Sequence, residues 1–322
     1  MRKLVLRRLL TLIPLVWLVV TLTFVVVHAA PGSYADTVEN PRLSPETRQA
    51  IRAHYGLDRP AHEQYLSWLG AVATGDLGQS FMYKEPVSRV LKRALPPTIL
   101  LAGSGLLLTL VLGLILAAAA ARNPSSWADR VVTVLSLGLY GVPSFWFAGI
   151  LILVFSLSLG WFPASHMYSV DAGNLQGLSR IADLLHHLFL PAVCLGLVGA
   201  AGTARYLRAT LLDVRSSRYI LAARARGIPG WRLLLVHSLR PALLPVVTLL
   251  GLSLPVLVAG SVVIETVFSW PGMGQVLYNA ARARDVPLIL GATLAGTAAV
   301  IVGNLVADLL YAVVDPRTRR AS

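Results

Sequence analysis

Long stretches without a charged side chain alternate with short charged segments along this chain. A membrane-spanning helix needs about 20 mostly apolar residues to cross the hydrocarbon layer, and six uncharged runs reach that length. They cover residues 9–27, 94–121, 131–170, 184–204, 241–264 and 286–307. Because the runs are continuously apolar rather than alternating, they indicate helices and not barrel strands. The pattern predicts an all-α membrane protein with six transmembrane helices.

Two of these runs admit another interpretation. The run 131–170 is long enough for two spans, but we expect one, because Trp161 and Phe162 are typical of an interfacial end and polar residues follow. The first run resembles a signal peptide, with basic residues before it and the cleavage-like sequence VHA at its end. Its apolar stretch exceeds the usual length of about 7–15 residues, so we expect a retained first span.

The charged segments divide the chain into four parts. These are a tail with the first span, an external loop, a transmembrane core and a second tail, over residues 1–30, 31–93, 94–314 and 315–322. The external loop is expected to fold. Ser44, Pro45 and Glu46 are typical of a helix start, and Gly56 of a helix end. A second helix is predicted over 61–73.

Composition supports a membrane location. Hydrophobic residues make up 56% of the chain and charged residues 13%, which excludes a disordered chain and an ordinary water-soluble globule. The net charge of +13 would suggest a nucleic-acid partner on a soluble protein. Here the excess of basic over acidic residues lies in four segments that a six-span topology places on one side. The positive-inside rule makes that side the cytoplasm, so we expect both termini there and no nucleic-acid partner.

Residues that would support catalysis or metal binding are scarce. None of the three lysines follows a glycine, so there is no P-loop with which this chain could bind and hydrolyse ATP. The single cysteine, Cys194, excludes an internal disulfide and a multi-thiolate metal site. His186 and His187 point to different faces of a helix and are expected to be interfacial. We therefore predict no catalytic residue, no metal and no cofactor bound by this chain.

The last run contains an intramembrane polar pair, Asn304 and Asp308, one helical turn apart. A carboxylate in a membrane is costly unless it is paired or hydrated, so Asp308 could serve a proton relay or a polar contact between helices. Asp308 lies close to the cytoplasmic end and has no chain of partner acids. We expect the interhelical contact.

Prolines and a tryptophan-proline segment mark candidate moving parts. Pro143 interrupts the third run and Pro255 the fifth, which suits kinked helices around a changing cavity and equally suits passive kinking. After the fifth run, Trp270, Pro271 and Gly272 predict a short external helix that starts at Pro271. This segment is a candidate outer gate.

The most informative polar segment is residues 205–240, with eight arginines and one acid. Ser216 or Ser217 can cap a short helix through RYILAARAR, which Gly227 ends. Alanines on this helix would let another surface approach closely, and arginines suit acidic or carbonyl partners. A basic helix lying on anionic lipid would use the same charges, so both interpretations stay open from the residues alone.

At this point the sequence resembles a known family. AARARG followed by VHSLRPALLP resembles the EAA loop of ABC importer permeases, in the variant of the dipeptide and oligopeptide permeases. YGLDRP, ETVFSWPGMGQVLYNAARARDVPLI and NLVADLLYAVVDPRTR are similar to the same family, and the resemblance covers essentially the whole chain. Two positions depart from the general EAA motif. Leu221 replaces its glutamate, and Arg240 replaces the proline of its closing Leu-Pro.

The resemblance implies a type I ABC importer transmembrane domain in a bacterial inner membrane. It implies a second permease subunit, two ATPase subunits that hold ATP and Mg²⁺, and an external solute-binding protein. Di- or oligopeptides would be the cargo, with a nickel chelate or an oligosaccharide as alternatives. The loop helix would be the coupling helix that docks on an ATPase subunit. It would comprise Ser217, Arg218, Tyr219, Leu221, Ala222, Ala223, Arg224, Ala225, Arg226 and Gly227.

Three other classes of protein make different predictions. A secondary carrier would work without ATPase subunits and would need intramembrane charges, which are scarce in these runs. A membrane enzyme would need a catalytic cluster. A purely structural subunit would leave the loop helix unexplained.

Overall fold

The structure is a computed structural model that describes residues 2–30, 58–242 and 262–314. Within these ranges every regular element is a helix, and one isolated bridge joins Gln79 and Pro86. The expected helix from Ser44 to Gly56, Pro255 and most of the fifth run lie outside the described residues. The helices are α1 (Arg2–Ala29), α4 (Ala61–Ala73), α5 (Val87–Arg122), α6 (Trp127–Gly141), α7 (Ser144–Leu151), η1 (Ile152–Ser158), η2 (Val170–Asn174), α8 (Leu178–Arg215), α9 (Arg218–Ala225), α10 (Gly230–Arg232), η3 (Leu233–Ser238), α11 (Leu239–Ala242), α13 (Val262–Val267), α14 (Met273–Ala283) and α15 (Val286–Val314).

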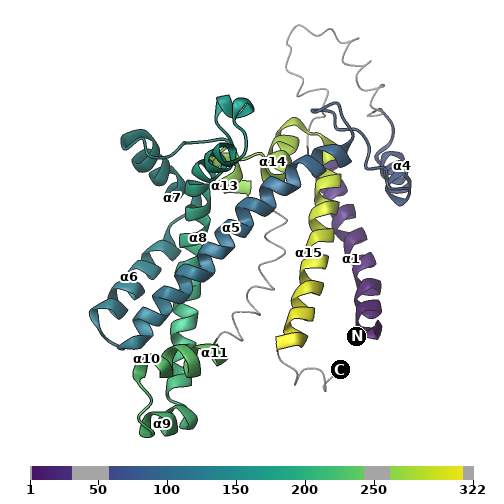
Figure 1. Cartoon of the computed structure of the whole chain (residues 1–322). Helices are drawn as coiled ribbons and strands as arrows, with labels where there is room; N and C mark the ends of the chain where they lie inside the picture. The colour runs from purple at the N-terminus through teal and green to yellow at the C-terminus, as the bar shows by residue number, and fades with distance from the viewer. Residues whose placement is uncertain (1, 31–57, 243–261, 315–322) are drawn as a thin grey trace.

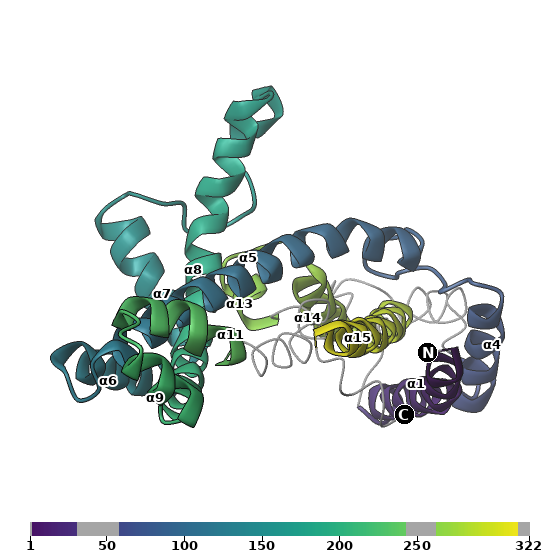
Figure 2. The ribbon, with the colours of Figure 1, turned by 60° about the horizontal axis from the view of Figure 1, so that its bottom comes forward.

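Helix α5 runs across the molecule and joins two groups of helices (Figures 1 and 2). Along much of its length α5 packs against α8, with α6 beside them. At its first turns it contacts α14 and α15, and α15 in turn packs against α1. Helix α4 has the bounds that the sequence predicts, 61–73, and lies beside α1.

Three described helices are long and apolar enough to cross a membrane: α5, α8 and the Val286–Asn304 part of α15. Helix α6 and the helical stretch Ser144–Ser158 meet that test together but are bent by 107°. If this pair is one broken span, the described residues hold four candidate membrane spans. The break falls at Pro143, as expected, because the residue before a proline is driven out of the helical conformation. Val142 is extended accordingly, with ψ 127°.

Three of the four basic segments of the sequence belong to the described part of the chain, and they lie at one end of the molecule. The start of α1, the turn between α5 and α6, helix α9 and the end of α15 all lie at the lower end in Figure 1. Helices α13 and α14 lie at the opposite end. This arrangement agrees with the one-sided charge distribution on which the topology prediction rests.

Glycines let α5 and α8 pack closely. A Cβ at Gly196 would lie 2.5 Å from the Cβ of Leu108, and one at Gly105 would lie 2.8 Å from the Cβ of Leu195. Small residues at such points allow two helix backbones to approach. Near this contact, Cys194 is buried in an apolar cluster that also includes residues of α7 and α13. The two helices therefore form one packed unit.

A buried carboxylate fixes the upper end of α15. Asp285 is fully buried, and its Oδ1 accepts the backbone N–H of Leu288 at 3.2 Å, which caps the helix. Its Oδ2 accepts the Ser80 hydroxyl at 2.5 Å and the Met82 N–H at 2.9 Å. One side chain thereby ties the start of α15 to the segment that leads into α5.

Candidate functional site

Helix α9 follows directly on α8 at the lower end of the molecule. The break between them is made by two serines, whose hydroxyls donate back to the last turn of α8. Ser216 Oγ bonds to the Asp213 carbonyl at 2.7 Å and Ser217 Oγ to the Val214 carbonyl at 2.5 Å. The predicted serine side-chain cap on α9 is therefore wrong. Ser217 does occupy the N-cap position, but it is its backbone carbonyl that accepts the first helical bonds.

Gly227 ends α9, as the sequence predicts. Its φ of 78° is left-handed, and its N–H donates to the Arg224 carbonyl at 2.9 Å. The N–H of Ile228 donates to the Ala223 carbonyl at 3.3 Å. These two bonds form a Schellman motif, which favours glycine because other residues are strained at that φ. A side chain at Gly227 would meet open space, so the backbone conformation alone calls for glycine.

One side chain anchors helix α9 in the protein, and most of its other side chains are exposed. Ile220 is fully buried, whereas Tyr219 and Leu221 are 51% and 50% exposed. Ala223 is half-buried. The other exposed residues of the predicted site are Arg218, Ala222, Arg224, Ala225, Arg226 and Gly227. At the lower end of the molecule (Figure 1), α9 thus exposes two large apolar side chains on different sides of the helix, together with guanidinium groups.

A basic cavity of about 600 Å³ lies behind α9. Its lining includes Arg122, Arg215 and Arg224, which come from α5, α8 and α9. Trp231 also lines it and is 62% exposed. Sequence reasoning did not single out this tryptophan; an aromatic residue among arginines in a polar loop was its only signal. The cavity can accept an acidic or carbonyl group of another surface.

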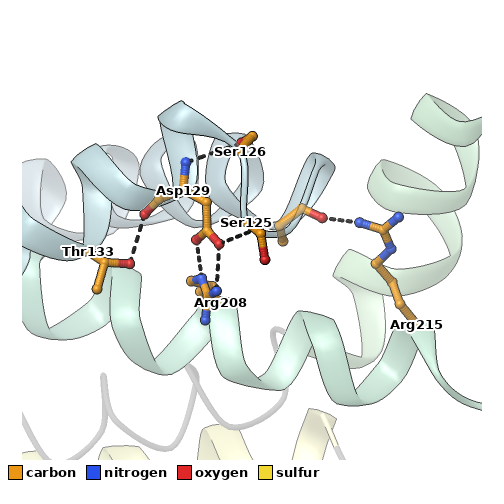
Figure 3. A network of polar contacts seen from close by, with 7 residues as sticks. Ser125, Ser126, Asp129, Thr133, Arg208 and Arg215 are labelled. Carbon is orange, nitrogen blue, oxygen red and sulfur yellow. Dashed lines mark hydrogen bonds and ion pairs between the residues drawn. The ribbon is translucent and has the colours of Figure 1, made fainter.

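An ion pair joins the start of α6 to the end of α8 (Figure 3). Arg208 donates from Nε to Asp129 Oδ1 and from Nη2 to Oδ2, the second bond at 2.7 Å. Asp129 is buried and also accepts the Ser125 N–H at 2.9 Å. Its own N–H donates to Ser126 Oγ, which caps α6. Bidentate pairs of this kind are among the strongest polar contacts in proteins.

This pair changes the ionisation of Asp129, which precedes the uncharged run 131–170. The hydrogen bond from Arg208 and the one from the Ser125 N–H hold the pKa of the carboxyl below its ordinary value, against the opposing effect of burial. The pKa of Arg208 is raised by the same contact. Asp129 therefore stays charged at any physiological pH.

Arg215 makes a second connection from α8 to α5. Its guanidinium donates to the Ala121 carbonyl and, at 3.1 Å, to the Arg122 carbonyl. These are carbonyls of the last helical turn, which lack intrahelical donors. The end of α8 thus holds both the end of α5 and the start of α6, and α9 continues from α8. A force on α9 would reach all three helices.

At the upper end, the predicted gate residues lie in a packed corner. Trp270 is fully buried and donates from Nε1 to the Pro97 carbonyl at 2.8 Å. Gly272 is buried and Pro271 is exposed. The helix expected to start at Pro271 begins at Met273 instead, with Gly272 at its N-cap position. A role of these residues in a gate stays a prediction.

Glu265, missed by sequence reasoning, organises this corner. It is buried, and its Oε1 accepts the Thr98 hydroxyl at 3.0 Å while Oε2 accepts the Gln275 N–H at 3.0 Å. Thr98 Oγ1 in turn accepts the Met273 N–H at 2.7 Å. Acceptors from outside the helix thus serve the free N–H groups in the first turn of α14, which agrees with its start at Met273. The network joins α13, α14 and α5.

The remaining predicted residues are only partly placed. Asn304 is exposed on α15. Asp308 lies one turn further along the same helix, but its side chain is outside the described part of the chain. Pro143 stands at the bend between α6 and α7. Among the described residues, no group of three or more His, Cys, Asp and Glu side chains could hold a metal ion.

Comparison with known proteins places the chain in a family. Residues 109–320 match the binding-protein-dependent transport system inner membrane component, and residues 1–102 match the N-terminal part of such membrane components. The chain is 41% identical to the oligopeptide transport system permease protein AppB of Bacillus subtilis (strain 168), over 97% of this chain and 98% of that protein. It is 36% identical to the di/tripeptide transport system permease protein DppB of Pseudomonas aeruginosa (strain UCBPP-PA14), over 97% of each. A putative peptide permease of Brucella ovis is 40% identical over 92% of this chain and 93% of its own length. The chain belongs to the family of inner-membrane components of binding-protein-dependent transport systems.

Proposed function

We propose that this chain is a permease subunit of an ATP-driven importer and forms half of the path for di- or oligopeptides. Relatives named as oligopeptide and di/tripeptide permeases match it over nearly their whole lengths, which supports a peptide cargo. The spans are almost uncharged. Such a path suits zwitterionic peptides of many sequences, because a strong fixed charge would hold some of them too tightly.

The proposed topology has six spans with both termini in the cytoplasm of a bacterial cell. It adds the first, third and fifth runs to the three helices that are long enough by themselves. The clustering of the three described basic segments at the end that carries α9 supports this orientation. The segment 31–93 then lies outside, where a solute-binding protein would approach.

The exposed face of α9 is the observation that carries the proposal. We infer that Leu221 inserts into a groove on an ATPase subunit while the arginines meet acidic or carbonyl groups around it. Two ATPase subunits would hold ATP and Mg²⁺, and a second permease subunit would complete the path. Closure of the ATPase pair would push α9, and the contacts of Arg208 and Arg215 would pass that motion to α5 and α6.

Vesicles that contain the complete purified importer test this function. With ATP inside and the binding protein outside, a labelled peptide should accumulate, whereas a nickel chelate and an oligosaccharide should not. Leu221→Glu should reduce uptake at least tenfold, because it replaces an exposed apolar side chain of α9 by a charge at the proposed contact with the ATPase. The matched control is Leu178→Glu at the start of α8, where Leu178 is 85% exposed. Uptake by the permease subunits without ATPase, or full uptake with Leu221→Glu, would refute the proposal.

A further inference from the structure

Two cavities adjoin where α4 lies against α1 and α15. The first, of about 260 Å³, is lined by Arg59, Gln64 and Ser67 together with the first residues of α15. The second, of about 470 Å³, is lined by apolar residues of all three helices, such as Val20 and Ala298. Trp68 of α4 lines both cavities and marks their boundary. An opening with three polar side chains therefore adjoins an apolar groove.

Side-chain contacts between α1 and α4 hold the walls of the groove together. The hydroxyls of Thr21 and Tyr65 are 2.7 Å apart and join α1 to α4. His28 Nε2 and Gln64 Oε1 are 3.3 Å apart and make a second link. The ring of Phe24 packs on that of Tyr65, with their centres 5.0 Å apart. Helix α4 is thus held in place over the groove.

Two polar groups at this site lack a partner in the described parts of the chain. The indole N–H of Trp68 is buried and has no hydrogen-bond acceptor there. Arg59 is exposed at the opening and forms no ion pair with a described residue, and no acidic side chain lines the cavity beside it. The opening therefore favours an anion.

The order of these chemical groups matches that of a phospholipid. A guanidinium binds phosphate well, and an apolar groove accepts an acyl chain. Leu294 and Val302 lie eight residues apart on α15, so the groove follows the helix for roughly 12 Å. We propose that this site binds one anionic glycerophospholipid of the outer leaflet, with its phosphate at Arg59 and one acyl chain between α1, α4 and α15.

Anionic lipid is favoured over zwitterionic lipid by the lining of the opening. An ethanolamine headgroup would bring an ammonium group, and none of the described residues that line the opening is acidic. The bound lipid would connect α1 and α4 to α15. It would therefore hold the N-terminal part of the chain against the transmembrane core.

Native mass spectrometry of the complete importer tests the proposal. The delipidated complex is titrated with phosphatidylglycerol or with phosphatidylethanolamine of the same chain length. We expect one phosphatidylglycerol to bind at least fivefold more tightly than phosphatidylethanolamine. Arg59→Gln should remove that difference, whereas Arg89→Gln, an exposed arginine on α5, should keep it.

One further variant and one competitor separate a lipid from a free anion. Ala298→Phe fills the groove and should weaken the binding of both lipids. Glycerol phosphate, which has no acyl chain, should not compete. Phosphatidylglycerol binding unchanged by Arg59→Gln, or unchanged by Ala298→Phe in correctly assembled complex, would overturn the proposal. Competition by glycerol phosphate would replace it with a simple anion site.

Discussion

Asp129 in the first turn of α6 and Arg208 near the end of α8 are 79 residues apart in sequence and form a two-point ion pair. The pair lies on the same stretch of α8 that leads into α9. In the proposed importer it is the point at which motion of the loop helix reaches a second transmembrane segment.

Asp129→Asn should lower the free energy of unfolding by about 1.5–3 kcal/mol, the usual contribution of hydrogen bonds between charged groups. The substitution leaves Arg208 without its partner carboxylate. It should also increase the ATP hydrolysed per peptide imported. Asp213→Asn, an exposed acid on the same segment of α8, is the matched control. Equal thermal stability and equal coupling in the two variants would contradict a role for the pair.

The pH dependence of this contact follows from the lowered pKa of Asp129. A group whose pKa is depressed on folding stabilises the protein above its unfolded value, about 3.9 for aspartate, and loses that effect as pH falls through the lower, folded value. The stability difference between the native protein and Asp129→Asn should therefore be constant from pH 8 to about pH 5. Thermal unfolding at a series of pH values measures it. A difference that disappears between pH 7 and pH 6 would show that another group controls the contact.

Gly227→Val should uncouple ATP hydrolysis from uptake. The left-handed backbone at this position, with φ 78°, disfavours a β-branched side chain by about 1–2 kcal/mol or more, so the end of α9 should shift. Gly230→Val is the control, because a side chain at Gly230 also meets open space but its φ is not left-handed. The ratio of ATP hydrolysed to peptide imported should rise only for the first variant. A similar ratio in both would mean that the conformation of Gly227 is unimportant.

Gly196→Ala should destabilise the α5–α8 unit, since the new Cβ would lie 2.5 Å from the Cβ of Leu108. Overpacking of this kind costs about 1–3 kcal/mol. Gly202→Ala on the same helix meets open space and should be neutral or stabilising, by up to about 1 kcal/mol from helix propensity. Thermal unfolding in detergent distinguishes the two. Equal melting temperatures would show that α5 and α8 can move apart at Gly196 without a loss of stability.

Thr98→Val should loosen the corner at which α13 and α14 meet α5. The change removes the hydroxyl that donates to Glu265 and accepts from the Met273 N–H, which costs about 1–3 kcal/mol for each buried group left unsatisfied. Thr98→Ser retains both bonds and should restore most of the stability. If the serine variant is as unstable as the valine variant, the methyl contacts of Thr98 matter rather than its hydroxyl.

The sequence predicts local features of this protein well. Continuous apolar runs indicate α5, α8 and α15 because each run carries its own signal of length and hydropathy. The bounds of α4, the break at Pro143 and the end of α9 at Gly227 depend on residues within one helical turn, and the structure agrees with all three.

Features that depend on distant residues could not be predicted in this way. In the sequence, Arg208 is recognisable only as one of the basic residues of the segment 205–240. Its partner Asp129 becomes visible only in the folded structure. Glu265 follows an apolar run without any pattern that marks Thr98 as its partner. The start of α14 was misplaced for the same reason, because the donors and acceptors around Met273 come from another helix. The predicted serine side-chain cap of α9 does not form, because the hydroxyls of Ser216 and Ser217 donate instead to carbonyls in the last turn of α8.

Site-directed cross-linking from α9 tests the central claim most directly. The chain has a single native cysteine, Cys194, which is buried, so one introduced thiol can be addressed selectively. A cysteine replacing Leu221 should cross-link to an ATPase subunit in the assembled importer, and the yield should change when ATP is added. A cysteine replacing Leu178 should give no such product. Absence of cross-linking from position 221 in an importer that still takes up peptide would contradict the docking of α9 on the ATPase.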